Sequence, residues 1–313
     1  MTSIVQEKVK QAIQILQQKN IDAWLTFVRE TTAGGDPILP LIYGQDLTWN
    51  SALILTANGA SIAIVGRYEA ESALRTGAFT QVISYDQSIK PDLVRTLVDL
   101  KPQQIAINYS LNDVHADGLS HGMYQLLIRY LAETPLLDRL IPAEEIIAAL
   151  RGIKTSSEVE CIQGAVKTTG LIFNHTFAYM RLGMTEIQIA EFMHDQLRAF
   201  NVGPAWDLDH CPAVNTGPNS PVGHAGPTDL KVEPGHLVHF DFGVKQDDYC
   251  SDIQRVVYFL KPGETHPPEP VVRAFDTVYG AVQQAFSAIR PGRQGKEIDA
   301  IARRVITDAG YPE

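Results

Sequence analysis

The chain has 313 residues and a formal net charge of −10, because 26 Lys and Arg residues stand against 36 Asp and Glu residues. At typical domain sizes this length predicts about two domains, each large enough for a core of its own. A hydrophobic content of 45% and a charged content of 20% are those of a globular protein, not of a disordered or membrane-spanning one. The acidic balance, without a cluster of Lys and Arg, argues against nucleic acid or an anionic membrane as partner and favours a peptide or small-molecule substrate.

The N-terminus predicts an amphipathic helix rather than a targeting signal. Within residues 1–20, apolar side chains recur every three or four positions, with Gln and Lys between them. No run in the chain approaches the roughly 18 apolar residues of a membrane-spanning helix. The three cysteines form no closely spaced pair, and their odd number does not suggest a disulfide framework. We therefore expect a cytoplasmic protein.

Residues 1–151 predict a small α/β domain. Strands are expected at 23–27, 51–56, 61–65, 81–85 and 104–109, and helices at 68–75 and 92–100. Asn58-Gly59 separates two of the strand runs and predicts a hairpin between them. Neither GxGxxG nor GxxxxGK[ST] occurs, so no motif marks this domain as nucleotide-binding.

A second domain is expected from residue 152 onward. Ser157 and Glu160 have the spacing of a capping box that opens a long helix to about Met180. Another capping box starts at Thr185, and strand-like runs follow at 236–243 and 249–260. Long helices are then expected at about 269–289 and 296–309. These two helices begin a weak repeat of the preceding order of elements, which is helix, helix and hairpin. The hairpin of the second copy does not appear before residue 313.

The sharpest local pattern is a predicted hairpin with an aspartate on each arm. With Gln246 and Asp247 as the turn residues, the numbers of paired residues sum to 493, which places Asp241 directly opposite Asp252. Their Cβ atoms would then be about 5 Å apart. Because two carboxylates this close repel one another when both are ionised, they need a cation, a shared proton or exposure to solvent.

Two interpretations of this pair are open on the residues alone. Paired divalent metals about 3.5–4 Å apart are a common hydrolytic device, and the apolar residues that flank both aspartates suit a buried site. Alternatively, the two aspartates are edge charges beside a solvated turn. Oxygen ligands by themselves favour manganese or magnesium, whereas zinc, cobalt or iron would need added imidazole.

The same stretch resembles the pita-bread metallopeptidases, which include Xaa-Pro aminopeptidases, prolidases, methionine aminopeptidases and creatinase-like enzymes. Their Asp-x-Gly and Ser-Asp-x-(Thr/Gln)-Arg motifs are matched by residues 241–243 and 251–255. Residues 230–235 resemble the family's lead-in to the first strand, and residues 215–224 resemble the loop that carries its substrate-facing histidine. The resemblance implies a creatinase-like α/β domain at 1–151 and an α+β pita-bread catalytic domain at 152–313.

This resemblance implies a dinuclear-metal hydrolase that acts on Xaa-Pro or related amide bonds of a peptide or small amide. Asp241 would ligate one metal and Asp252 would bridge both. The metals would be two divalent ions, with Mn expected and Co, Zn or Fe as alternatives. His224 would be the catalytic histidine that hydrogen-bonds the substrate. The family also implies a homodimer in which the first domain reaches the cleft of the partner.

The family uses a later histidine and two later glutamates, which have no counterpart in this sequence. That histidine follows a Gly-Tyr-Pro-like segment, and here residues 310–312 are followed only by Glu313. The missing ligands and the unfinished repeat together predict a C-terminally truncated family member. Two alternatives are a non-catalytic pita-bread binding module and a metal-free creatinase-like amidinohydrolase with His224 as the acid/base group. Retention of both aspartates favours the metallopeptidase.

Other polar residues near the motif are better explained by packing than by catalysis. His239 shares the strand face of Asp241, opposite Gln254 in the predicted register, and we expect it to be packed or to support a ligand. Cys250 is expected to be a small core residue rather than a nucleophile. The set of His210, Cys211 and Cys250 lacks the closely spaced ligand pairs of a zinc site.

Overall fold

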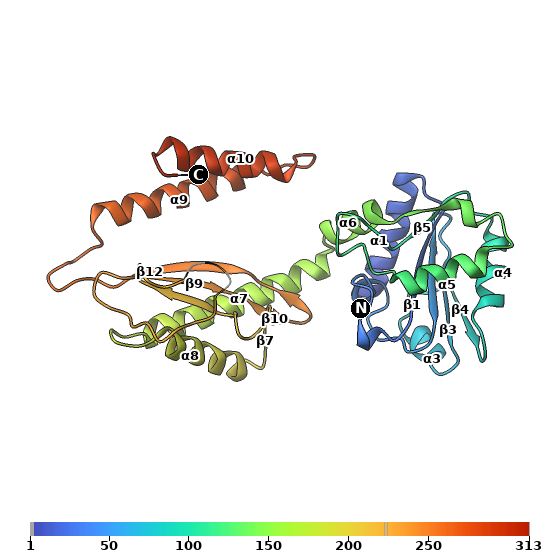
Figure 1. Ribbon diagram of the computed structural model, residues 1–313, viewed down its shortest axis with the longest axis horizontal. Helices are drawn as coiled ribbons and strands as arrows, with labels where there is room; N and C mark the ends of the chain where they lie inside the picture. Colours follow the sequence, from blue (N-terminus) through green and yellow to red (C-terminus); the bar gives the residue numbers. More distant parts are fainter. Residues whose placement is uncertain (1–2, 222, 224, 313) are drawn as a thin grey trace. The chain divides into compact units, whose positions relative to one another are not determined.

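The computed structural model describes residues 3–221, 223 and 225–312. The chain divides into two compact units, Met1–Glu160 and Cys161–Glu313, which Figure 1 shows in blue to green and in green to red. The domain boundary predicted between residues 151 and 152 falls at the end of helix α6 (Glu144–Gly152) and stays a prediction. Within the described ranges, no helix is long and apolar enough to cross a membrane.

The first unit is built on a six-stranded sheet of order β4-β3-β2-β1-β5-β6. Its strands are β1 (Ala23–Val28), β2 (Ser51–Thr56), β3 (Ser61–Gly66), β4 (Gln81–Tyr85), β5 (Ile105–Ile107) and β6 (Leu140–Pro142). β2 is antiparallel to both its neighbours, whereas the other neighbouring pairs are parallel. The predicted hairpin joins β2 and β3, and Gly59 in its turn has a φ of +97°, which glycine adopts without strain.

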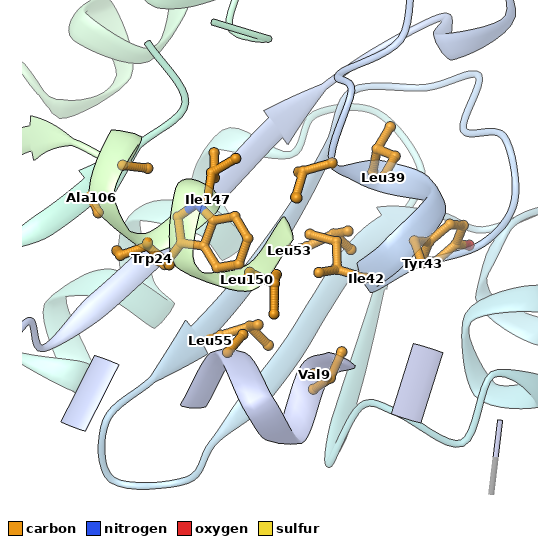
Figure 2. Close-up of a cluster of buried hydrophobic side chains, with 14 of the residues drawn as sticks. Val9, Trp24, Leu39, Ile42, Tyr43, Leu53, Leu55, Ala106, Ile147 and Leu150 are labelled. Carbon is orange, nitrogen blue, oxygen red and sulfur yellow. The ribbon is translucent and has the colours of Figure 1, made fainter. Parts of the chain in front are cut away.

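Helices cover both faces of this sheet. They are α1 (Ile4–Lys19), α2 (Leu39–Ile42), α3 (Ala70–Arg75), α4 (Lys90–Leu100), α5 (His121–Leu131) and α6. Side chains alternate along β1, so Trp24 and Leu25 belong to the cores on opposite faces. Figure 2 shows the core beneath α1, α2 and α6, where Trp24 and Leu55 lie among Val9 and Leu150.

A buried ion pair ties α1 to the first turn of α7 (Ser156–Tyr179). Lys8 Nζ lies 2.9 Å from Glu158 Oε2, and the two side chains are only 0% and 2% exposed. The same ammonium group donates hydrogen bonds to the carbonyl oxygens of Leu150 and Ile153, where α6 ends. Lys8 therefore holds the connection between α6 and α7 against α1.

The cap at the start of α7 differs from the predicted one. Thr155 N donates to Glu158 Oε2, and Glu158 N donates to Thr155 Oγ1, so the reciprocal pair lies two residues before the predicted pair of Ser157 and Glu160. Ser157 Oγ instead donates to Glu7 Oε1 of α1, at 2.7 Å. The hydroxyl of Ser157, which the local pattern predicts as the helix cap, thus binds a residue far away in the sequence.

A second buried polar cluster joins the loop after β1 to the end of β5. Asp36 accepts hydrogen bonds from Asn108 Nδ2 at 2.7 Å and from the backbone of Ile38 at 3.1 Å. Asn108 Oδ1 accepts in turn from Trp24 Nε1 at 2.6 Å. Burial raises the pKa of Asp36, and these hydrogen bonds only partly oppose the rise.

The second unit packs α7 and α8 (Glu186–Ala199) on an antiparallel sheet of order β12-β9-β8. The strands of this sheet are β8 (Ala213–Thr216), β9 (Leu237–Phe242) and β12 (Ile253–Tyr258). A smaller sheet of order β11-β10-β7 comprises β7 (Gly203–Pro204), β10 (Val244–Gln246) and β11 (Tyr249–Cys250). Phe240 of β9 contacts Phe173 and Phe177 of α7. Because side chains alternate along a strand, His239 and Asp241 lie on the sheet face away from these helices.

A pair of helices follows the sheet. They are α9 (Glu269–Ala288) and α10 (Gly295–Asp308), which pack against each other and have nearly the predicted bounds. Large apolar side chains recur every three or four residues of α9 and are more than a third exposed. They are Val272, Phe275, Val278, Tyr279, Val282 and Phe286, together with Ile289 directly after the helix, and we call them the α9 stripe.

Candidate active site

The turn of the aspartate hairpin lies one residue later than predicted. Asp247 and Asp248 have φ values of +51° and +63°, and Gln246 pairs with Tyr249. Two consecutive residues with positive φ are typical of the two-residue hairpin turn, and aspartate tolerates this conformation better than glutamine does. The numbers of paired residues therefore sum to 495, and Asp241 lies opposite Gln254 rather than Asp252.

The two aspartates nevertheless come together on one face of the sheet. Burial raises the pKa of Asp241, and the nearby charge of Asp252 and a hydrogen bond between the two carboxyl groups raise it further. Asp241 Oδ1 is buried and has no hydrogen-bond partner among the described residues. Such an atom is costly to bury unless something binds it.

These features fit the chemistry of a divalent cation. Two adjacent carboxylates are hard oxygen ligands, a cation would relieve their repulsion, and Asp241 Oδ1 is free to bind it. In the part of the chain that the structure describes, no group of three or more His, Cys, Asp and Glu residues is arranged to hold a metal ion. A cation bound here would therefore need ligands in addition to Asp241 and Asp252.

Ser251 and Gly243 fix the strand break from which Asp252 projects. Ser251 Oγ lies 2.6 Å from Thr169 Oγ1 of α7 and accepts a hydrogen bond from Val244 N at 2.8 Å. A Cβ atom on Gly243 would lie 2.1 Å from the carbonyl oxygen of Ser251, which is far inside contact distance. Close backbone packing therefore explains the glycine of the Asp-x-Gly motif. The contact with α7 explains the serine of the Ser-Asp motif.

The loop that contains His224 is held at both ends by one side chain of α8. Glu186 is fully buried, and its carboxylate accepts hydrogen bonds from Thr216 N at 2.6 Å, Thr228 N at 2.9 Å and Thr228 Oγ1 at 2.7 Å. His224, the predicted catalytic histidine, lies outside the described residues. Its role stays a prediction from the sequence.

A row of polar side chains crosses the sheet to Asp241. His239 Nδ1 lies 3.2 Å from Asn215 Oδ1, and His239 Nε2 lies 3.2 Å from Gln254 Oε1. Gln254 Nε2 donates to Asp241 Oδ2 at 3.3 Å. In the observed register His239 pairs with Val256, not with Gln254 as predicted, so its bond to Gln254 runs diagonally between the strands. Sequence reasoning missed Gln254 as a neighbour of Asp241, because only the corrected register reveals it.

The cysteines differ from one another in their surroundings. Cys211 is buried, and its Sγ donates to the carbonyl oxygen of Gly243 at 3.3 Å. Burial raises the pKa of this thiol, which makes it a poor nucleophile. Cys250 was predicted to lie in the core but is exposed, because it belongs to the two-residue edge strand β11. Cys211 therefore does not support thiol chemistry at the site.

Comparison with known proteins identifies the second unit. The sequence profile of metallopeptidase family M24 matches residues 160–313. Residues 160–313 are therefore an M24 metallopeptidase domain. An Xaa-Pro dipeptidase of Lactobacillus delbrueckii subsp. lactis is 32% identical over 200 residues, which are 64% of this chain and 52% of that protein. The uncharacterized peptidase YqhT of Bacillus subtilis is 31% identical over 196 residues, 62% of this chain and 52% of that protein. The chain thus spans about half the length of these relatives.

Solved structures show that the fold extends over both units. An Xaa-Pro dipeptidase from Bacillus anthracis superposes with a TM-score of 0.72 and 21% identity, covering 98% of this chain and 78% of that one. An X-Pro aminopeptidase from Thermotoga maritima gives a TM-score of 0.70 and 24% identity, covering 94% of this chain and 78% of that one. The predicted fold class, a creatinase-like α/β domain followed by an α+β pita-bread domain, is confirmed.

Proposed function

We propose that the polypeptide containing these residues is a metal-dependent peptidase that hydrolyses Xaa-Pro or related amide bonds. The observation that carries this proposal is the Asp241–Asp252 pair, in which a buried oxygen without a hydrogen-bond partner among the described residues lies beside a second carboxylate. The printed name of the Lactobacillus relative supports proline-containing peptides as the substrate class. A homodimer in the cytoplasm, as predicted from the sequence, belongs to the same proposal.

In this proposal the two aspartates bind the metal ions and His224 binds the substrate. Asp241 would hold one divalent ion, with Mn²⁺ expected, and Asp252 would bridge two ions. When bound, such ions lower the pKa of water and stabilise negative charge on the scissile carbonyl oxygen. His224 would donate a hydrogen bond to the substrate, and Glu186 would hold the loop of this histidine in place by its bonds to Thr216 and Thr228.

The competing functions make different demands on the aspartates. A pita-bread binding module needs no paired carboxylate, and a metal-free amidinohydrolase would rely on His224 alone. Neither function explains why Asp241 Oδ1 is buried beside Asp252 with no partner in the described part of the chain. The carboxylate pair therefore favours the metallopeptidase.

The test compares Asp252→Asn with Asp247→Asn in the protein expressed from its own gene. Asp247 is exposed at the hairpin turn, and asparagine tolerates its positive φ, so this variant matches the charge change away from the site. We expect Asp252→Asn to lose bound Mn²⁺ in elemental analysis and to lose hydrolysis of Xaa-Pro dipeptides, whereas Asp247→Asn keeps both. Equal Mn²⁺ content in the two variants would contradict the proposal. Turnover of creatine without metal would establish the amidinohydrolase instead.

A further inference from the structure

We propose that residues 205–211, which we call the Trp206 loop, form a wall of the substrate site and select peptides with an apolar first residue. Leu208 is the residue of this loop that contacts the side chain before the scissile bond. The inference rests on the proposed function. It adds a substrate class that the two aspartates by themselves do not define.

One side of the Trp206 loop packs against the strand that carries Asp241. A Cβ atom on Gly243, two residues after Asp241, would lie 2.9 Å from Trp206 Cζ3. Ala205 N also donates to the carbonyl oxygen of Gly243 at 3.1 Å. The loop leads into β8, where Ala213 pairs with Asp241 across the sheet. The Trp206 loop therefore borders the end of β9, where Asp241 lies.

The other side of the loop contacts the segment that contains His224. A Cβ atom on Gly226 would lie 2.8 Å from the carbonyl oxygen of Asp209, so the two backbones are in close contact. Gly226 lies two residues after His224 in the sequence. In the proposed function the substrate lies between the metal site and this histidine. A loop that contacts both segments is therefore placed to contact the substrate as well.

Hydrogen bonds within the loop hold it in one conformation. Trp206 Nε1 donates to the carbonyl oxygen of His210 at 2.9 Å, which closes the loop. Inside it, His210 N donates to the carbonyl oxygen of Asp207 at 3.0 Å, and Asp209 N donates to Asp207 Oδ1 at 3.2 Å. These bonds define a tight turn with Leu208 as its second residue. A wall that is already ordered loses little conformational entropy when a substrate binds.

Leu208 supplies the apolar surface of this turn. Its side chain is 51% exposed, and its neighbours Asp207 and Asp209 are exposed acids. Packing of an apolar substrate side chain against Leu208 removes apolar surface from water and so favours binding. The preferred substrates are therefore peptides whose first residue is aliphatic or aromatic.

The test compares Leu-Pro with Gly-Pro as substrates of the Mn²⁺-loaded protein. We expect Leu208→Ala to lower the ratio of kcat/KM for Leu-Pro to kcat/KM for Gly-Pro about tenfold, because a contact with one substrate side chain is lost. Leu208→Met, which keeps the apolar volume, should retain the wild-type ratio. Leu171→Ala is the control, since Leu171 is 40% exposed on α7, which packs on the sheet face away from the site.

A readout without turnover separates this inference from the proposed function. Calorimetry measures the binding of Leu-Pro and Gly-Pro analogues in which CH₂ replaces the carbonyl group of the scissile bond, so that neither can be hydrolysed. Wild type should bind the Leu-Pro analogue more tightly, and Leu208→Ala should reduce this preference about tenfold. If it does and no dipeptide is cleaved, the proposed function fails and the inference stands. An equal loss for both analogues, an unchanged preference in Leu208→Ala, or no binding of either analogue by the wild type overturns the inference.

Discussion

Asp241 lies directly opposite Gln254 across β9 and β12, while the carboxyl group of Asp252 lies close enough to raise its pKa. One aspartate is therefore in contact with a neutral donor and with a second acid at once. This arrangement depends on the backbone at the strand break as much as on the two acids.

Gly243→Ala should damage both the fold and the metal site. The added Cβ would lie 2.1 Å from the carbonyl oxygen of Ser251 and 2.6 Å from Ala205 Cβ, so the strand that carries Asp252 must move. We expect a loss of about 2 kcal/mol or more in the free energy of unfolding, measured in urea, together with weaker Mn²⁺ binding. Gly280→Ala in α9 is the control, because its Cβ would meet nothing within 4 Å and helix propensity favours alanine by about 1 kcal/mol. Equal effects of the two substitutions would refute the packing argument.

Lys8→Met should strongly destabilise the first unit. The substitution removes the ammonium group from a carboxylate that is 2% exposed and from two carbonyl oxygens at the end of α6. Removing one partner of a buried ion pair costs about 3–5 kcal/mol, to be measured by urea unfolding with tryptophan fluorescence. Lys10→Met, on an exposed position of the same helix, should change stability by no more than about 0.5 kcal/mol. A small loss in Lys8→Met would show that water replaces the ammonium group.

Asp36 should make the first unit less stable as the pH rises. The ordinary pKa of an aspartate is 3.8, and burial raises the pKa of Asp36 in the folded protein above it. A group with a raised folded pKa contributes stability that is fully present below its unfolded pKa and is lost as the pH rises through its folded pKa. The stability advantage of wild type over Asp36→Asn should therefore be larger at pH 4 than at pH 8, in urea unfolding at both values. An advantage that grows with pH would mean that the carboxylate is stabilised in its ionised form.

His224→Gln should slow turnover without weakening metal binding. A residue that donates a hydrogen bond to the reacting substrate contributes about 10²–10³-fold to kcat. We expect kcat/KM for an Xaa-Pro dipeptide to fall by that factor, while the Kd for Mn²⁺ stays at the wild-type value. His266→Gln, at an exposed loop position, should change neither quantity. A parallel loss of Mn²⁺ affinity would make His224 a metal ligand instead.

Sequence patterns predicted the capped helices and the hairpin turn well, because these features depend on residues that are close together in the sequence. The capping box at Thr185 is confirmed, since the side chain of Gln188 and the hydroxyl of Thr185 bond each other's backbone. The hairpin of β2 and β3 follows from Asn58-Gly59, whose preference for positive φ lies in the residues themselves. Strand alternation also placed His239 and Asp241 on the same face of β9, as predicted.

The register of the site could not be predicted in the same way. Gln246-Asp247 and Asp247-Asp248 are both polar pairs between two strand runs, and only the positive φ values of the second pair decide between them. The bond between His239 and Gln254 is diagonal across two strands, so it depends on that register. The roles of Asp241, Asp252 and His224 come from the family motif and stay predictions.

The α9 stripe has a practical consequence for judging whether this polypeptide is folded. Its exposed aromatic and aliphatic side chains lie on a well-formed helix, with Phe286 exposed by 70%. Fluorescent dyes such as ANS bind surfaces of this kind and are used to diagnose molten globules. We therefore expect the native chain to increase the fluorescence of ANS. This increase alone would not distinguish the ordered protein from a molten globule. Near-UV circular dichroism, which responds to fixed aromatic packing such as that of Phe173 on Phe240, is the measurement that tells the two states apart.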